Sequence, residues 1–543
     1  MRHLKPAVRK NSRIYYGNVD DSHDTVRERF DLSDGPDSEN GFIPSDRPKM
    51  FLNRIQAISW LKQFEPMIFS KVKGKLPPEG LHSTIYAAAK GVVQKLTKEA
   101  KEEGFIDDSE QGEAKEETEA IKVSLKDKTI CIIDHGISIH LAEKLAESYG
   151  EVLLYIPNIE AYPCPDRDVI GTGLEGVTRI YDIHDAMEKG KVDIFFFPDI
   201  GFSGMQRHLK EMGFHVCGSG DSDILELDKW FFQEQLEKAG LPTAKTEKIK
   251  GIAALKEYLK KKKEGDCFIK ISFHRGLMET KRWLGEFLSS VWLKDLEVRL
   301  GHHAESQVFL VQDKIDSIGE IGMDTFNLDG ELPENSLCGL EIKDAGYLCR
   351  VFKEQPEILQ EVNDKMATVF KKLGMNGQYS TEVRITEKLE GYYIDGTMRM
   401  PSPPGELMPE MYKKHNYAQA IWDLAHNKLP VLEPAFLYGA EIIITSSWLE
   451  DNHWLPVEFP EECKKYIRLK NYHIMNGKYY IIPNGNGAFL GAAIGMGNTP
   501  EEACKMALKY ADMVHGEDVK YEPDVLERAQ KGIAKMKAAG ISF

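Results

Sequence analysis

The sequence predicts an α/β protein built around a parallel β-sheet, and two observations support this prediction. Between residues 129 and 218, short apolar segments alternate with segments of helical period, and this alternation is typical of βαβ units. Residues 129–134 (TICIID) and 192–198 (VDIFFFP) are continuous apolar runs, as expected for strands that are buried on both faces of a sheet.

The same alternation defines the other elements of this region. Ligands of parallel sheets bind at the carboxyl ends of the strands, which here are residues 134–138 and 199–203. His135 lies in the first of these loops, and His274 lies in the loop that follows the strand at residues 267–271. Both histidines are candidates for testing, and a surface or packing role is the alternative. Helices are expected at residues 139–148, 182–188 and 206–212, and further strands at residues 151–156 and 215–218.

The composition narrows the class of protein. The chain has 543 residues, 86 Asp plus Glu against 70 Lys plus Arg, and 42% hydrophobic residues. At about 150 residues per domain, this length predicts three or four domains. The net charge of −16 argues against nucleic acid as a partner. The 8 cysteines form no CxxC pair, so neither a disulfide framework nor a zinc ribbon is expected.

No apolar run approaches the roughly 18 residues that a membrane helix needs. The first residues (MRHLKPAVRK) are basic but lack the apolar segment of a secretory signal. We therefore expect a cytoplasmic protein that has no membrane partner.

The first 120 residues differ in composition and periodicity from the rest of the chain. Residues 1–48 are polar and without periodicity, which suggests an arm, whereas residues 50–100 contain apolar side chains at helical spacing. Residues 101–120 carry nine acidic residues and two lysines. Such a segment repels itself and cannot bury apolar surface, so we expect a domain boundary there, after a small helical appendage.

One glycine motif points to a different function. Residues 171–176 (GTGLEG) match G-x-G-x-x-G, which binds dinucleotides when a strand precedes it and a helix opens from it. The preceding residues contain two prolines and do not resemble a strand. A loop is the favoured interpretation, and a nicotinamide-dependent oxidoreductase remains the alternative.

A family resemblance begins at residue 229. Residues 229–240 (KWFFQEQLEKAG) form an amphipathic helix that ends in glycine and is followed by LPTAKT. This pattern resembles the start of the ATP-grasp domain, above all that of phosphoribosylamine–glycine ligases, and the similarity extends in order from about residue 128 to residue 535. It implies a Rossmann-like parallel-sheet domain (121–225), a two-lobed α+β ATP-grasp domain (226–434) and a small C-terminal α/β unit (435–543). The N-terminal arm and appendage (1–120) have no counterpart in the family.

The resemblance also implies a nucleotide site. A lysine on a strand should hold the phosphates beneath a loop, and Lys270 in CFIKI followed by SFHRGLMETKRW fits this arrangement. The loop has one glycine where the family has several, but its cationic side chains could supply charge in place of backbone donors. A strand at residues 308–315 (VFLVQDKI) should border adenine. The implied nucleotide-binding residues are Lys229, Lys270, Arg275, Lys281, Gln312, Asp313, Ile315 and Glu320.

The metal site is expected on a hairpin. Glu382 lies on its first strand, and Asp395, Thr397 and Arg399 lie two residues apart on the second, so they share one face. An antiparallel partner can bring Glu382 alongside Asp395, and two carboxylates suit Mg²⁺ (or Mn²⁺) bound to ATP. By resemblance, Glu382, Asp395 and Thr397 hold the metal, whereas Arg399 and Lys281 act on the reacting groups. The family has Asn at position 397, Glu at position 395 and Phe-Gly-Asp-Pro-Glu where this chain has MPSPPGE.

Beyond residue 435, strands are expected at residues 440–445 and 479–482. Residues 488–503 resemble the closing segment of the family but lack its arginine. Thr499 as N-cap, Pro500 at the first helical position and Glu502 three residues after the cap predict a helix start.

The resemblance implies an ATP-dependent carboxylate–amine ligase of purine biosynthesis, with a small carboxylate and an amine as substrates. ATP would phosphorylate the carboxylate, and the amine would then attack the acyl-phosphate, which releases phosphate beside the ADP formed first. The altered glycine loop and Thr397 leave open a catalytically degenerate protein that acts as a binding or structural module. A homo-oligomer also remains open.

Overall fold

The computed structural model describes residues 4–10, 13–18, 123–157, 165–188, 190–272, 280–483 and 487–541. They belong to two compact units, residues 1–121 and 122–543. In the first unit, two antiparallel strands form where the sequence suggested an arm: β1 (Leu4–Lys10) and β2 (Arg13–Asn18). β2 contains Ile14, Tyr15 and Tyr16, which favour strands. The expected appendage and acidic boundary (50–120) lie outside the described residues.

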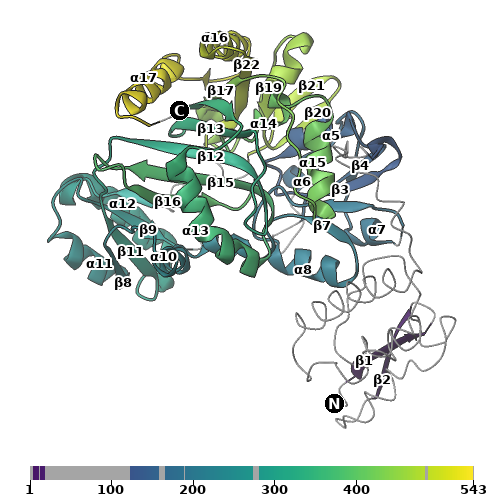
Figure 1. Ribbon diagram of the computed structural model, residues 1–543, viewed down its shortest axis with the longest axis horizontal. Coiled ribbons are helices and arrows are strands. Elements are labelled where there is room, and N and C mark those ends of the chain that lie inside the picture. Colours follow the sequence, from purple (N-terminus) through teal and green to yellow (C-terminus); the bar gives the residue numbers. More distant parts are fainter. Residues whose placement is uncertain are drawn as a thin grey trace, which may run out of the picture. The chain divides into compact units, whose positions relative to one another are not determined.

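The second unit begins with the expected parallel sheet, which has five strands in the order β5-β4-β3-β6-β7 (Figure 1). β5 was not predicted, because it lies at the edge of the sheet and only its last residue, Ile180, is buried. The strands are β3 (Thr129–Ile133), β4 (Glu151–Tyr155), β5 (Val177–Ile180), β6 (Ile194–Phe196) and β7 (His215–Cys217). The helices of this region are η2 (Leu125–Asp127), α5 (Ile139–Ala146), α6 (Pro165–Asp168), α7 (His184–Met187) and α8 (Ser203–Glu211).

Both faces of this sheet are buried. Along β3, Ile130 and Ile132 belong to one apolar cluster, whereas Cys131 and Ile133 belong to another. In β6, Phe196 and Phe195 divide in the same way. This arrangement explains why the strands are continuous apolar runs in the sequence.

The strand order reverses between β3 and β6. The chain runs outward from β3 through β4 to β5 and then returns to β6 beside β3, before it continues to β7. Such a topological switch point opens a crevice at the carboxyl ends of the two central strands, where ligands of α/β sheets bind. Asp134 follows β3, and Asp199 lies just beyond β6.

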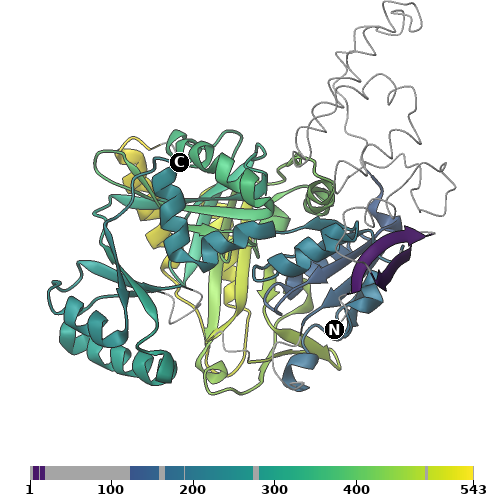
Figure 2. The same cartoon turned by 90° about the horizontal axis from the view of Figure 1, so that it is seen from below.

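A second sheet has four antiparallel strands in the order β10-β9-β11-β8. Two helices cover one of its faces and enclose a separate apolar core that includes Leu255, Ile269 and Phe309 (Figure 2). Its elements are β8 (Thr246–Lys250), α11 (Ile252–Leu259), β9 (Cys267–Ile271), β10 (Thr280–Arg282), α12 (Gly285–Leu300), η5 (Gly301–His303) and β11 (Val308–Asp313).

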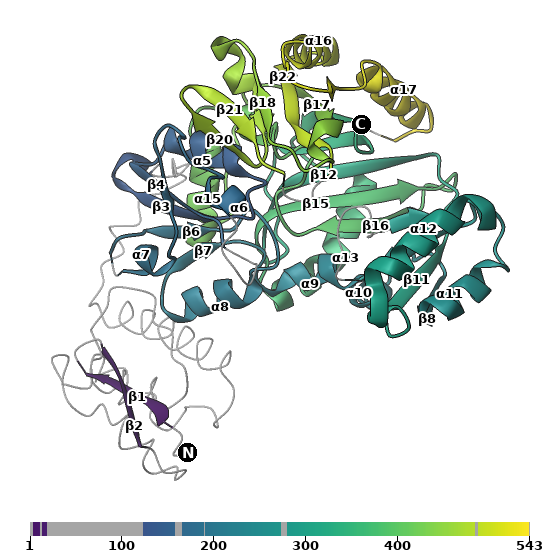
Figure 3. The same ribbon diagram turned by 180° about the vertical axis from the view of Figure 1, so that it is seen from behind.

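A third sheet has nine strands, which come from both sides of residue 435, the expected start of the C-terminal unit. Its order is β16-β15-β12-β13-β14-β17-β22-β19, with β23 beside β17 (Figure 3). β14 pairs directly with β17, so the strands of the C-terminal residues continue the sheet of the preceding region. The strands are β12 (Gly319–Leu328), β13 (Ser336–Ile342), β14 (Gly346–Phe352), β15 (Asn376–Ile385), β16 (Gly391–Thr397), β17 (Tyr438–Ser446), β19 (Ile467–Leu469), β22 (Phe489–Gly497) and β23 (Val519–Lys520).

Helices and a small sheet complete the unit. α10 begins after Asp228, whose carboxylate accepts hydrogen bonds from the amides of Trp230 and Phe231. α16 begins with the predicted capping box, which is confirmed for Thr499 and Glu502. The remaining elements are η3 (Gly220–Asp223), α9 (Ile224–Leu227), α10 (Lys229–Lys238), α13 (Glu357–Leu373), α14 (Met408–Met411), α15 (Asn416–Ala425), η6 (Ser447–Leu449), β18 (Leu455–Val457), η7 (Glu461–Tyr466), β20 (Tyr472–Met475), β21 (Lys478–Ile481), α16 (Pro500–Ala511) and α17 (Val525–Ala538).

Among the described residues, no helix combines the length and the apolar composition that crossing a bilayer requires.

Candidate functional site

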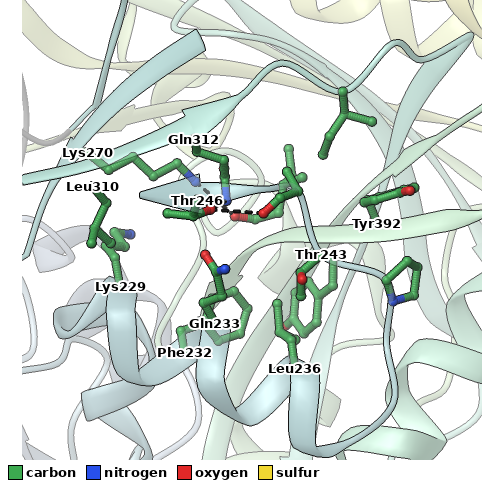
Figure 4. Close-up of a pocket in the computed structure, with 15 residues that line it drawn as sticks. Lys229, Phe232, Gln233, Leu236, Thr243, Thr246, Lys270, Leu310, Gln312 and Tyr392 are labelled. Carbon is green, nitrogen blue, oxygen red and sulfur yellow. Dashed lines mark hydrogen bonds between the residues drawn. The ribbon is translucent and has the colours of Figure 1, made fainter. Parts of the chain in front are cut away.

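A pocket lies between the four-stranded sheet, the start of α10 and the edge strand β16. Its space is about 470 Å³, part of which is open to solvent. Apolar side chains such as Phe232 and Leu310 form much of the wall, and Lys229 and Lys270 add two cationic side chains (Figure 4). A largely apolar pocket that contains a few charged groups suits a nucleotide, because the base needs apolar walls and the phosphates need cations.

Lys270 occupies the open face of its sheet. Along β9, Cys267, Ile269 and Ile271 are buried against the helices, whereas Phe268 and Lys270 are only half-buried and point to the other face. The Nζ atom of Lys270 lies 3.4 Å from the carbonyl oxygen of Ile394 on β16. Lys270 therefore spans the gap between the two sheets.

Lys229 is the first residue of α10 and is 7% exposed. Its Nζ atom lies 3.3 Å from Oδ1 of Asp395. The capping of the helix by Asp228 fixes the backbone of this turn, so the ammonium group is held at the wall of the pocket beside Asp395.

The predicted adenine segment forms another side of the pocket. Gln312 and Ile315 both line it, and the Nε2 group of Gln312 donates to Oγ1 of Thr246 at 3.2 Å. Asp313 instead forms a salt bridge with Lys262 and is not among the lining residues.

A group of acidic residues crosses the neighbouring sheet. The strand register pairs Glu382 on β15 directly with Asp395 on β16, so the two carboxylates share a face, as the hairpin argument expected. Glu320 on β12 is paired with Arg384, and its Oε2 atom lies 2.8 Å from Nε of that residue. Thr397 is paired with Ser380, at the far end of β16.

The charges of this group are strongly coupled. Burial, and then the hydrogen bond with Glu320, raise the pKa of Glu382 well above its usual range. Burial alone would raise the pKa of Asp395, but the charges of Lys229 and Lys270 outweigh it and lower the pKa. The lowered pKa favours the ionised form of Asp395, whereas the raised pKa favours the protonated form of Glu382 beside Glu320.

This donor set fits a divalent cation. Carboxylate oxygens are the preferred ligands of Mg²⁺, which usually takes one or two of them and completes its shell with phosphates and water. Glu382 and Asp395 could supply two such ligands beside the cationic wall of the pocket. Within the described part of the chain, no group of three or more His, Cys, Asp or Glu side chains is arranged to hold a metal by itself.

Arg399 lies beyond the end of β16 and contacts an acidic residue after β6 and another in α9. Its Nε atom lies 3.0 Å from Oε1 of Glu226 and 3.7 Å from Oδ1 of Asp199, and its guanidinium also donates to the carbonyl oxygen of Met400. The arginine is thus held at the carboxyl edge of the parallel sheet.

Two other predicted residues are not brought into this group. Lys281 lies on β10 opposite Ile269, whose side chain belongs to the buried face. Paired residues of an antiparallel sheet share a face, so Lys281 projects away from the face of Lys270. Arg275 lies outside the described residues, and so does His274.

Lys343 was not among the predicted site residues. This residue follows β13, and burial would lower its pKa, but the charge of Glu382 and then that of Glu341 outweigh burial and raise it. No sequence signal pointed to it, because its place beside Glu382 depends on the strand register.

The glycine motif at residues 171–176 is followed by β5 and not by a helix. The amide of Gly171 donates to the carbonyl oxygen of Tyr472, and a Cβ on Gly173 would lie 2.1 Å from the carbonyl oxygen of Ile474. The glycines allow this loop to pack closely against β20, which provides no dinucleotide site.

Three solved structures share this architecture. Phosphoribosylamine–glycine ligase from Thermotoga maritima matches with 16% identity and a TM-score of 0.56, over 73% of this chain and 99% of that chain. The chain has the ATP-grasp fold. The biotin carboxylase domain of 2-oxoglutarate carboxylase from Hydrogenobacter thermophilus, solved with MgADP, ADP and bicarbonate, matches with 14% identity and a TM-score of 0.52, over 75% and 98% of the two chains.

A third ATP-grasp structure, biotin carboxylase from Campylobacter jejuni in complex with β-γ-ATP, matches with 12% identity and a TM-score of 0.50, over 73% and 98%. No protein-family model and no curated protein sequence matches the chain. In this ATP-grasp chain, the pocket and the carboxylate pair occupy the junction of the four-stranded and nine-stranded sheets.

Proposed function

We propose that the protein is an ATP-dependent carboxylate–amine ligase that forms an amide through an acyl-phosphate and releases ADP. The observation that supports this proposal best is the pairing of Glu382 with Asp395 beside the ammonium groups of Lys229 and Lys270. A transferring phosphoryl group needs cations on its oxygens and carboxylates that hold a divalent metal, and both kinds of group converge here.

The residues have distinct roles in this proposal. Lys229 and Lys270 bind the phosphates, with Arg275 as a further candidate, whereas Gln312, Ile315 and Glu320 border the nucleotide. Glu382 and Asp395, with Thr397, hold Mg²⁺ or Mn²⁺, which when bound would neutralise phosphate charge. Arg399 steadies the acyl-phosphate, because its planar fork matches carboxylate and phosphate oxygens. Catalysis then depends on position and electrostatics, without a side-chain nucleophile.

The substrates are a small carboxylate and an amine, in the cytoplasm. The ATP-grasp neighbour from Thermotoga maritima is named for phosphoribosylamine and glycine, and these are the first pair to test, as a step of purine biosynthesis. The MPSPPGE segment and the missing arginine near residue 488 replace the corresponding family motifs, so a different carboxylate or amine is the second hypothesis.

An ADP-release assay across a panel of carboxylates, with hydroxylamine or an amine as nucleophile, tests the proposal. Hydroxylamine converts an acyl-phosphate into a hydroxamate, which a ferric colour reaction detects. We expect ADP and hydroxamate in equal amounts with at least one carboxylate, and loss of both in Asp395→Asn. ATP binding without ADP release from any carboxylate would instead favour the degenerate binding module.

A further inference from the structure

A short, tightly closed loop follows Arg399 in the chain. The guanidinium of Arg399 donates to the carbonyl oxygen of Met400 at 3.0 Å, and residues 401–406 (PSPPGE) then turn back on themselves. The amide of Gly405 donates to the carbonyl oxygen of Pro401 at 2.8 Å. A Cβ on Gly405 would lie 2.2 Å from that oxygen, so this close turn requires glycine.

The 401–406 loop is packed into the protein at the carboxyl edge of the parallel sheet. The amide of Met400 donates to the carbonyl oxygen of Pro198, just beyond β6, at 2.8 Å. Of residues 399–406, only Arg399 and Ser402 are not buried. These are therefore the two side chains of the segment that a substrate can reach.

One ammonium group connects the two ends of this loop. Glu406 is 0% exposed, and its Oε1 atom lies 2.9 Å from Nζ of Lys470. The hydroxyl group of Ser402 donates to the same Oε1 atom at 2.9 Å and accepts a hydrogen bond from Nζ of Lys470. Lys470 thus binds the first part of the loop through Ser402 and the last residue through Glu406.

The main chain of Lys470 is itself fixed by the nine-stranded sheet. Lys470 directly follows β19 and is 8% exposed. Its amide donates to the carbonyl oxygen of Leu490 on β22 at 2.9 Å. The ammonium group therefore extends from a rigid strand end, and its position does not depend on the loop that it holds.

The next residue, Asn471, holds a second loop at the same edge. Its amide donates to the carbonyl oxygen of Gly136, in the loop after β3, at 2.8 Å. In that loop, Nδ1 of His135 lies 2.9 Å from Oδ2 of Asp199. The other carboxylate oxygen of Asp199, Oδ1, lies 3.7 Å from Nε of Arg399. Two adjacent residues after β19 therefore support the surroundings of Arg399 from two sides.

The ion pair of Lys470 and Glu406 is buried, and burial limits what it contributes to stability. Burial would raise the pKa of Glu406, but nearby positive charge, above all that of Lys470, outweighs burial and lowers the pKa to about 2. A buried ion pair often adds little to stability, because removing two charges from water cancels much of their attraction. Each charge still needs the other, so the pair fixes the direction of both side chains. These contacts favour a role in geometry.

We propose that Lys470 is a positioning residue for the carboxylate substrate: through Glu406 and Ser402 it holds the 401–406 loop, and with it Arg399, in the geometry that receives the acyl group. This inference rests on the proposed ligase function. It places the support of the carboxylate side in the C-terminal residues of the chain, and it makes Ser402 a wall of that side.

The nucleotide side should be independent of this support. In the described part of the chain, neither Lys470 nor any residue of the 401–406 loop belongs to the wall of the nucleotide pocket. A loss of the loop geometry should therefore change the reaction with the carboxylate and leave the binding of Mg·ADP as it is.

Two variants test the proposal in the hydroxamate assay. Lys470→Met alone would leave Glu406 buried without its cation and destabilise the fold, so the double variant Lys470→Met/Glu406→Gln removes both charges. Ser402→Ala breaks the connection without changing a charge. Because a displacement of about 1 Å can lower a rate about 100-fold, both variants should lower kcat/KM for the carboxylate at least about 10-fold. The affinity for Mg·ADP in isothermal titration calorimetry should stay unchanged in both.

Lys464→Met is the matched control. Its Nζ atom lies 2.8 Å from Oε1 of Glu143, at 28% and 16% exposure, so it also removes an ion pair between a C-terminal residue and the preceding region. It should leave both kcat/KM and the affinity for Mg·ADP unchanged.

Two results would overturn the positioning role. One is an unchanged kcat/KM in both test variants, and the other is a loss of Mg·ADP affinity equal to the loss of kcat/KM, which would indicate general damage to the fold. Absence of hydroxamate from the unmodified protein with every carboxylate would instead refute the ligase function, and this inference with it.

Discussion

Replacing Lys270 by methionine tests the nucleotide pocket most directly. The ammonium group lies 3.4 Å from the carbonyl oxygen of Ile394, at a distance that lets it contact a phosphate between the two sheets. A hydrogen bond to a charged group contributes about 1.5–3 kcal/mol, which corresponds to about 10- to 150-fold in affinity. Methionine keeps the length and apolar stem of the side chain, so the fold should be retained. We therefore expect Lys270→Met to weaken binding of Mg·ADP by this factor in isothermal titration calorimetry.

Lys248 provides a matched control on the same sheet. The register places Lys248, Leu310 and Lys270 in one row across β8, β11 and β9, so the two lysines point to the same face. Lys248 is exposed, lies over the ring of Trp230 and is not part of the pocket wall. Lys248→Met should leave the affinity within about twofold. Equal affinities of Lys270→Met and the unmodified protein, or equal losses in both variants, would refute the assignment of Lys270.

Three further predictions concern the metal pair, the core and a helix start. Asp395→Asn should reduce carboxylate-dependent ADP release at least about 100-fold, because a metal ligand contributes several kcal/mol, whereas Asp316→Asn, 95% exposed, should have no effect. Burial raises the pKa of Asp324 to about 7, so the folded protein binds this proton more tightly than the unfolded chain. About 4 kcal/mol of stability should therefore be lost as pH rises from 4 to 7, and unfolding curves of Asp324→Asn should lack this loss; an identical pH dependence in both proteins would contradict the assignment. Thr499→Ala removes the cap of α16 and should lower the unfolding free energy by about 1 kcal/mol. Thr243→Ala serves as the control, because it removes the hydroxyl group of a threonine that caps no helix.

The parallel sheet was predictable because its central strands are buried on both faces. β3 and β6 have no exposed side, so nearly every residue is apolar and the pattern is visible without any knowledge of the fold. β5 was missed for the opposite reason. Its sequence, VTRI, contains an exposed threonine and a half-buried arginine, and such an edge strand resembles a loop in composition.

Adjacency within one hairpin was also predictable, whereas adjacency between strands distant in sequence was not. Glu382 and Asp395 belong to consecutive strands, and a two-residue period with an antiparallel return is sufficient to place them together. The direction of the Lys281 side chain depends on the register of β10, because a shift of one residue moves the side chain to the other face of the sheet. The placement of Lys343 beside Glu382 depends on a turn between two other strands, β13 and β14. Neither placement could therefore be derived from the local sequence.

The reacting end of the site shows why family resemblance and local pattern together still leave the substrate open. Arg399 was identified from its position two residues after Thr397, but its partners lie far earlier in the chain: Asp199 follows β6, and Glu226 lies in α9. Whether an arginine faces an anionic or a cationic substrate is decided by such partners.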